Sequence, residues 1–267
     1  KSSAASDVYK RQPLNSSNGR IELFYRHRDN EVVESPFERL DIQSNSNTYK
    51  LSFSQPIMQT PWQTLTLGLS AIKRDSQTSI LGENYPLSEG ADENGETKLS
   101  ILQLFQDYEL RGKNQVLAFN SRFNLGLGIL DATKNSNEPD SRFFYWRGQG
   151  QWVRELAKNT LLVLGIDIQL SPSDLVPRER FGLGGYRSVK AYRQDTRLTD
   201  NGALGTVELR LPVPGISGKN RLFQVVPFID GGVAWNSDDE EVEGSKALAA
   251  AGVGLPVSYT HLTLPTT

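Results

Sequence analysis

The residues of this chain that are best suited to binding lie in one long connection. The stretch "FGLGGYRSVKAYRQD", Phe181 to Asp195, sits in a connection over residues 172–201, between two segments that alternate like β-strands. It combines glycines, tyrosines and cationic side chains. Loops longer than about 12–15 residues are uncommon in compact domains and are usually functional or disordered. Because this composition is not that of a disordered linker, we expect an ordered loop that folds against another part of the protein.

The sequence offers no convincing catalytic or metal-binding set. Its histidines are His27 and His261, and no Ser/His/Asp or His/Glu cluster surrounds His27. A hydrolase would need a nucleophile with a positioned base. The segment "GLGG", residues 182–185, lacks the Lys-Ser/Thr and the helix of a phosphate-binding loop, and the sequence has no cysteine. We therefore expect no enzyme activity, no cofactor and no metal.

Both ends of the chain read as foreign to the fold. "KSSAASDVYKRQ" and "VSYTHLTLPTT" look like translated sequencing-adaptor tails, so we do not expect them to belong to the native domain. The expected organisation is a tail at 1–12, one domain at 13–256 and a second tail at 257–267. Without the charged residues of the tails, 26 basic and 30 acidic residues remain, a net charge of −4. This is not the charge balance of a nucleic-acid-binding protein.

The elements that must position the loop are strands. Apolar and polar residues alternate strictly, as in "TYKLSFS" and "TLTLGLSA", and such a period of two indicates half-buried β-strands. No run approaches eighteen apolar residues, which excludes a membrane-spanning helix but not a membrane β-barrel. We predict an all-β fold of about ten strands without a helix, near residues 19–28, 48–54, 64–71, 98–111, 122–129, 142–156, 162–171, 206–213, 221–235 and 246–255.

Long and short connections alternate along the predicted meander. The gaps near 29–46, 75–97, 131–141, 172–202 and 236–245 are long, and those between them are short. An antiparallel meander places all long loops at one rim, as in outer-membrane barrels. A soluble sandwich or a lipocalin-like barrel shares the alternation but turns its apolar face inward. The Gly-, Ser-, Asn- and Gln-rich polar face, and aromatic residues near strand ends, favour an antiparallel transmembrane β-barrel.

This interpretation makes a direct prediction about side-chain direction. In a membrane barrel the apolar residues lie on the convex face, and we expect this of Leu65, Leu67, Leu69, Leu162, Leu164 and Ile166.

Three segments carry a resemblance to a known family. "FGLGGYRSVKAYRQD", "NGALGTVELRLPV" and "VVPFIDGGVAW" resemble the barrel signature of the two-partner secretion transporters, the haemolysin secretion/activation family, in wording close to that of cyanobacterial members. The resemblance covers nearly all of residues 19–255. It implies two POTRA domains before a sixteen-stranded barrel, of which this chain would hold about strands five to fourteen.

The resemblance also implies a role for the loop. In the family the loop folds into the lumen, and the arginine of a Val-Arg-Gly-Phe/Tyr motif meets an aspartate on the wall. Here the motif is Val189, Lys190, Ala191 and Tyr192, and the wall partners are Phe228 and Asp230 in "PFIDGG". Lysine keeps the charge but lacks the planar fork of arginine, and alanine accepts a positive φ less readily than glycine.

Other residues of the loop remain candidates. Gly184 and Gly185 are expected to order the loop, while Arg187 and Arg193 compete with Lys190 for the same carboxylate. Read without the family, a loop lysine is usually a solvated charge, and an aspartate before two glycines is often only a turn residue.

The function implied is an outer-membrane pore that translocates a large exoprotein of the adhesin or haemolysin type. Its expected partners are that exoprotein and outer-membrane lipid, its expected location is the bacterial outer membrane, and no nucleic acid is expected. The alternatives are a barrel-assembly factor of the same superfamily or a diffusion porin, and an outer-membrane lipase or acyltransferase. The lack of a usable histidine disfavours the enzyme.

Overall fold

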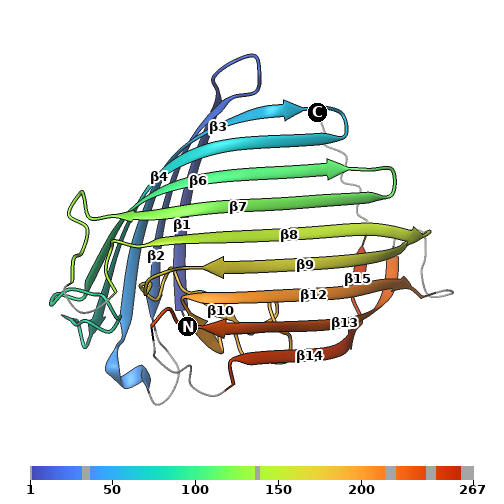
Figure 1. The fold of residues 1–267 in the computed structure, drawn as a ribbon. Coiled ribbons are helices and arrows are strands. Elements are labelled where there is room, and N and C mark those ends of the chain that lie inside the picture. The colour runs from blue at the N-terminus through green and yellow to red at the C-terminus, as the bar shows by residue number, and fades with distance from the viewer. Residues whose placement is uncertain (1, 32–36, 136–138, 214–220, 239–244, 260–267) are drawn as a thin grey trace.

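The computed structural model describes residues 2–31, 37–135, 139–213, 221–238 and 245–259, and these residues form an antiparallel β-structure (Figure 1). Phe37–Leu40 forms a short 3-10 helix, and the described residues contain no α-helix. The strands are β1 Ser2–Pro13, β2 Arg20–Glu31, β3 Gln43–Gln59, β4 Gln63–Ile80, β5 Glu83–Asn84, β6 Glu96–Arg111, β7 Gln115–Leu127, β8 Phe144–Ala157, β9 Thr160–Leu170, β10 Phe181–Leu183, β11 Arg197–Thr199, β12 Asn201–Pro212, β13 Arg221–Trp235, β14 Ala247–Gly254 and β15 Val257–Tyr259.

One curled sheet follows chain order. Its strands pair in the order β1-β2-β3-β4-β6-β7-β8-β9-β12-β13-β14, with β5 on β4 and β15 on β13, while β10 and β11 form a separate hairpin. The ten predicted segments correspond to β2, β3, β4, β6, β7, β8, β9, β12, β13 and β14, so the all-β antiparallel prediction is confirmed. The sheet is open, because no pairing joins the described residues of β1 and β14.

One edge of the sheet differs from the expectation. The sequence of residues 1–12 reads as a tail, yet residues 2–13 form β1 and pair with β2 along its whole length, from Ser2 opposite Glu31 to Pro13 opposite Arg20. The unpaired backbone groups of an edge strand accept any extended segment. Strand β2 is therefore covered by β1, whereas the outer side of β14 has no partner among the described residues.

The two rims of the sheet differ in the length of their connections. The strand ends that are joined by the long connections, over 32–42, 81–95, 128–143, 171–200 and 236–246, lie at one rim, on the left and lower side of Figure 1. The tight rim carries turns such as 60–62, 112–114 and 158–159. In the last of these Asn159 has φ 62°, a left-handed conformation that asparagine tolerates in a tight turn. The predicted sorting of loops is confirmed.

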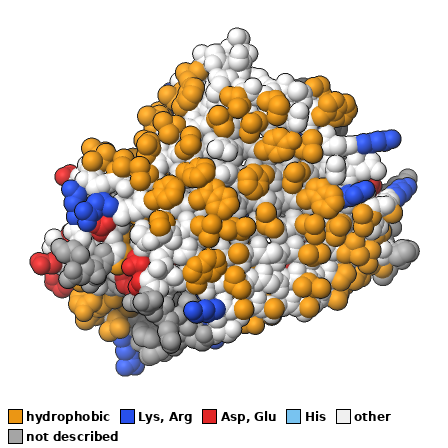
Figure 2. All heavy atoms as spheres, in the orientation of Figure 1, with side chains coloured by type: hydrophobic (Ala, Val, Ile, Leu, Met, Phe, Trp, Pro, Cys, Tyr) orange, Lys and Arg blue, Asp and Glu red, His pale blue; other side chains and the backbone are white. Residues whose placement is uncertain are grey.

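The convex face of the sheet is apolar, as predicted. Leu69 and Ile166 are 47% and 49% exposed, whereas Ser70, which follows Leu69 in β4, is fully buried. Alternate residues of a strand share a face, so Leu65 and Leu67 lie with Leu69, and Leu162 and Leu164 lie with Ile166. Figure 2 shows hydrophobic side chains spread over this face.

Aromatic residues lie near both rims of the apolar face. Trp62 is exposed at the tight rim, and Trp235 ends β13 at the long-loop rim. Tyr25 and Tyr49 pack with ring centroids 5.0 Å apart. Such positions suit the headgroup regions on either side of a membrane. The described residues contain no helix long and apolar enough to span a membrane.

The buried core lies on the concave side, between the sheet and the long connection 171–200. One cluster joins the start of this connection to β4, β6 and β8, through Leu175 and Val176 with Ile72, Leu99, Ile101, Phe143 and Tyr145. A second joins its later part to β13 and β14, and consists of Phe181, Leu183, Val189, Ala234 and Leu248. The enclosed space is thus partly filled by this connection, which we call the inward loop.

Candidate functional site

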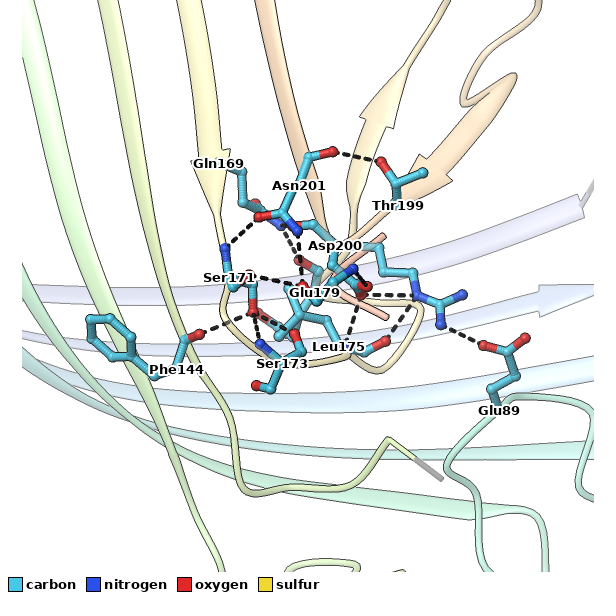
Figure 3. Close-up of polar contacts among 12 residues, drawn as sticks. Glu89, Phe144, Gln169, Ser171, Ser173, Leu175, Glu179, Thr199, Asp200 and Asn201 are labelled. Carbon is cyan, nitrogen blue, oxygen red and sulfur yellow. Dashed lines mark hydrogen bonds and ion pairs between the residues drawn. The ribbon is translucent and has the colours of Figure 1, made fainter. Parts of the chain in front are cut away.

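A polar network fixes the two ends of the inward loop (Figure 3). The Gln169 side-chain amide donates to the carbonyl oxygens of Glu179 and Asp200, at 2.9 and 3.1 Å. The Asp200 carboxylate accepts from the backbone N–H of Leu175 at 2.8 Å and of Ser237 at 3.0 Å. Asp200 is 1% exposed. These contacts hold the ends of the loop at the long-loop rim, so the middle of the loop is directed inward.

Glu179 attaches the first half of the loop to the wall. Its carboxylate pairs with Arg74 of β4 and accepts a hydrogen bond from the Tyr145 hydroxyl of β8 at 2.7 Å. The Glu179 side chain is only 3% exposed. Glu179 was not predicted from the sequence, because Arg74 and Tyr145 lie far from it along the chain.

Two wall glycines provide space for loop side chains. A Cβ on Gly202 would overlap the ring of Phe181, and a Cβ on Gly232 would lie 2.6 Å from Leu183 Cδ1. Phe181 and Leu183 belong to β10 and are almost fully buried. Gly232, the second glycine of "DGG", thus leaves room for the Leu183 side chain of the loop. A Cβ on Gly231 beside it would meet no atom closer than 4.0 Å.

Backbone turns shape the loop before its tip. Gly184 and Gly185 have φ 112° and 103°, conformations that favour glycine. The Gly184 N–H donates to Ser188 Oγ at 3.1 Å, and the Gly185 N–H donates to the Val189 carbonyl oxygen at 3.2 Å. This turn positions Val189, which is fully buried in the cluster with Phe181 and Leu183.

The tip of the loop brings Lys190 to Asp230. Lys190 Nζ lies 3.2 Å from Asp230 Oδ2 and 3.3 Å from Oδ1, and the Lys190 backbone N–H donates to Oδ2 at 3.2 Å. Nζ also lies 4.5 Å from the centre of the Phe228 ring, within cation–π distance. Asp230 is fully buried. The residues that the sequence named from distant segments are therefore in contact.

Glu208 of β12 is a second carboxylate at the same lysine. Its Oε1 lies 3.1 Å from Lys190 Nζ, and its Oε2 lies 3.2 Å from Arg210. Burial alone would lower the pKa of Lys190, but its hydrogen bonds to Glu208 and Asp230 raise that pKa above the ordinary value. Alternation places Glu208 on the polar face of its strand but does not connect it with Lys190. Glu208 lies directly opposite Phe228 in the pairing of β12 with β13, so the strand register is the feature that could have linked Glu208 to this site.

The remaining motif residues have distinct environments. Ala191 adopts φ 76°, a left-handed conformation that favours glycine. The Tyr192 hydroxyl donates to the Ala249 carbonyl oxygen at 3.4 Å and is partly exposed. Arg187 and Arg193 are exposed, and neither contacts Asp230 among the described residues. The lysine, rather than either arginine, occupies the carboxylate site.

A cavity with both polar and apolar lining lies beside the loop within the enclosed space. It has a volume of about 540 Å³, and Arg187 of the loop contributes to its lining. Its wall includes Asp107 and Glu109 of β6 and Asp167 of β9. Hydroxyl and amide side chains, such as those of Thr206 and Gln151, also face it. The loop therefore leaves a solvated space, where an extended chain can form hydrogen bonds.

Comparisons with known proteins agree with this geometry. The family model for haemolysin secretion/activation protein ShlB/FhaC/HecB matches residues 3–257. A structure of CdiB from Escherichia coli is similar with a TM-score of 0.78 and 18% identity, over 96% of this chain and 47% of that one. CdiB from Acinetobacter baumannii is similar with a TM-score of 0.73 and 19% identity, over 97% and 45%.

A more distant likeness has the same type of fold. BamA from Haemophilus ducreyi lacking POTRA domains 1–3 has a TM-score of 0.59 and 11% identity, over 97% of this chain and 59% of that one. A comparison with curated protein sequences gives no match. The chain spans less than half of the length of either CdiB structure.

Proposed function

The chain belongs to the haemolysin secretion/activation protein family ShlB/FhaC/HecB, and we propose that it forms part of the wall of a bacterial outer-membrane pore that translocates a secreted exoprotein. One observation carries the proposal: the inward loop is held by its tip cation at a buried wall carboxylate, within a sheet whose convex face is apolar. Outer-membrane lipid contacts the convex face in this proposal. The role is transport rather than catalysis.

The proposed mechanism follows from the two kinds of surface inside the pore. The polar wall offers many hydroxyl, amide and charged groups, so it binds an extended chain at many weak sites without trapping it. The inward loop acts as a plug, and the contacts of Lys190, Phe181 and Leu183 set how readily it leaves the wall. Folding of the exoprotein outside the cell supplies the driving force, since no nucleotide-binding element is expected.

The test uses the full-length gene together with the exoprotein gene expected beside it. Both are expressed in a bacterium that lacks them, and the exoprotein is measured in the medium. We expect Asp230→Ala to reduce secretion while the amount of barrel in the membrane is unchanged. Lys113→Gln, in the tight turn between β6 and β7, is the control and keeps wild-type secretion. Normal secretion with Asp230→Ala removes the plug contact from the mechanism.

The same experiment separates transport from assembly. Loss of the full-length protein should abolish appearance of its exoprotein without lowering the levels of other outer-membrane barrels. A general fall in the levels of those barrels would instead identify an assembly factor, the alternative function that the sequence leaves open.

A further inference from the structure

A group of cations faces the enclosed space from four strands and the inward loop. We call it the cationic patch, and it consists of Arg26 and Arg28 of β2, Lys50 of β3, Arg74 of β4, Arg122 of β7 and Arg178 of the loop. Thr48 lies directly between Arg26 and Arg74 across three neighbouring strands. Lys50 lies opposite Phe24 and Ile72, on the same concave face as Thr48. Arg26, Lys50 and Arg74 are therefore neighbours on one surface. Arg122 lies farther along the sheet, opposite Phe105 of β6, whose ring centre is 6.0 Å from Lys50 Nζ.

The members of the patch are close enough to repel one another. Lys50 is repelled by Arg122 and Arg74 and is attracted, to a smaller extent, by Glu22 and Asp107. Burial, and next the positive charge of Arg74, lower the pKa of Arg178, with smaller contributions from Arg28 and Arg26. The loop thus adds a further positive charge to a wall that is already positive.

The patch has fewer counter-ions than charges. Arg26 pairs with Asp7 at 2.7 Å, and Arg74 pairs with Glu179. Lys50 donates only to the neutral amide oxygen of Gln103, at 3.4 Å. Arg28, Arg122 and Arg178 make no direct hydrogen bond or ion pair with the described residues, although Asp7 is close enough to attract Arg28 and Glu179 close enough to attract Arg178. Half of the patch is consequently available to an external anion.

Negatively charged side chains outnumber positive ones in the lining of the cavity beside the loop, in contrast to the cationic patch. Its charged lining includes Asp107, Glu109 and Asp167, with Arg187 as its cation. Asp107 and Glu109 lie near the tight-rim end of β6, whereas Arg28 and Arg74 lie toward the long-loop ends of their strands. An anionic segment is therefore disfavoured in the cavity and favoured at the patch.

We propose that the cationic patch is a transient binding site for carboxylate-bearing segments of the polypeptide that crosses the pore. The inference rests on the proposed function and adds to it a preferred substrate chemistry. Arg26 and Arg74 are two strand spacings apart, about 10 Å, so the patch is too wide for one small anion and suits side chains along an extended chain. Exposed ion pairs are individually weak, which lets such a segment move on.

The test measures peptide binding to the full-length protein in detergent at low salt. The probes are fluorescein-labelled oligoglutamate and oligolysine of equal length, and binding is followed by fluorescence anisotropy. Carboxylates should bind wild-type protein more tightly than ammonium groups do. The double substitution Lys50→Gln with Arg122→Gln should weaken oligoglutamate binding about tenfold or more, and Lys113→Gln, in a tight turn, should leave it unchanged.

Further measurements keep the outcome decisive. Heat-dependent migration on gels shows whether each variant is folded, and Arg122→Lys, which retains the charge, should retain the binding. Equal affinity of wild type and the folded double variant for oligoglutamate overturns the proposal. So does competition by free glutamate at equal carboxylate concentration, because that result identifies a small-anion site. No exoprotein is present, so a negative result here leaves the secretion experiment to decide the proposed function separately.

Discussion

Burial determines how much the contact between Lys190 and Asp230 contributes at the residue scale. An exposed ion pair would contribute at most about 1 kcal/mol, but Asp230 is fully buried and the Lys190 side chain is only 21% exposed. Removing one partner of a buried pair costs about 3–5 kcal/mol, because the other charge stays buried without compensation. The buried contact between Lys190 and Asp230 should therefore contribute more to loop docking than the same ion pair would in a hydrated lumen.

The two partners are expected to respond differently to substitution. Lys190→Met leaves Asp230 with only the Lys190 backbone N–H, whereas Asp230→Ala leaves Lys190 paired with Glu208. We expect Lys190→Met to destabilise loop docking by about 3 kcal/mol or more, and Asp230→Ala to destabilise it less. Limited proteolysis after Arg187 and Arg193 in the full-length protein measures how often the loop leaves the wall. Equal cleavage rates in the two variants would contradict this asymmetry.

Substitution of Ala191 is expected to stabilise, rather than weaken, the docked inward loop. Its φ of 76° costs an L-residue about 1–2 kcal/mol, and glycine removes that cost while losing about 0.5–1 kcal/mol of chain entropy. Ala191→Gly should therefore stabilise the docked loop by up to about 1 kcal/mol and slow the same proteolysis. Ala118→Gly, within strand β7, is the matched control and should give no such gain. Faster proteolysis in Ala191→Gly would show that the strain is not relieved by glycine.

The raised pKa of Lys190 predicts an alkaline opening of the pore. Because the pKa is higher in the docked loop, the ammonium contributes fully below the ordinary lysine value of 10.5 and its contribution is lost as pH rises through the raised pKa. Channel conductance of the full-length protein should therefore increase above about pH 10.5. Lys190→Arg stays charged there and should suppress the increase. The same increase in both proteins would assign it to another group.

At the residue scale, the sequence predicts some of the residues of the site but not all of them. Lys190 and Asp230 were named because a family motif links them, while periodicity alone gave no reason to connect residues so far apart. Glu208 and Glu179 were missed, because their partners on other segments become neighbours only through the strand register and the path of the loop. Ionic contacts across a sheet depend on that register, which alternation does not specify.

At the scale of elements, alternation identified the strands of the meander and the sorting of their connections. It did not identify the hairpin of β10 and β11, which is three residues long in each arm. That hairpin is held by Phe181 and Leu183 against wall glycines, not by its own length. Tertiary packing therefore decides this element, and sequence periodicity carries little information about it.

Adjacent glycines of β13 form a matched pair for testing how the hairpin docks. A methyl group on Gly232 would meet Leu183 and the Ala203 carbonyl oxygen, whereas one on Gly231 would come no closer than 4.0 Å to another atom, the Leu248 carbonyl oxygen. Gly232→Ala should thus displace the loop and speed proteolysis after Arg187, at a cost of about 1–3 kcal/mol typical of overpacking. Gly231→Ala should behave like wild type. Similar effects of both substitutions would mean that strand β13, rather than hairpin docking, is being perturbed.

At the scale of the whole molecule, the isolated chain exposes two surfaces that promote association, an apolar sheet face and unpaired strand edges. Leucine, isoleucine and aromatic side chains cover its convex face, and contiguous apolar patches of this sort drive association in water. Strands β1 and β14 also end the sheet, and the outer side of each has no strand partner among the described residues. Burying either surface requires lipid, detergent or another chain, because side-chain rearrangement alone cannot cover a full sheet face.

The isolated 267-residue chain should consequently aggregate in aqueous buffer and disperse in detergent. Detergent covers the convex face but cannot pair backbone groups at β14, so some association through that edge should persist at high protein concentration. Light scattering in buffer, in detergent, and in detergent with Val253→Pro measures the two contributions separately. Proline removes a backbone donor from the free edge strand, so this variant should associate less than wild type in detergent. A monodisperse monomer in detergent-free buffer would contradict the assignment of the convex face to lipid.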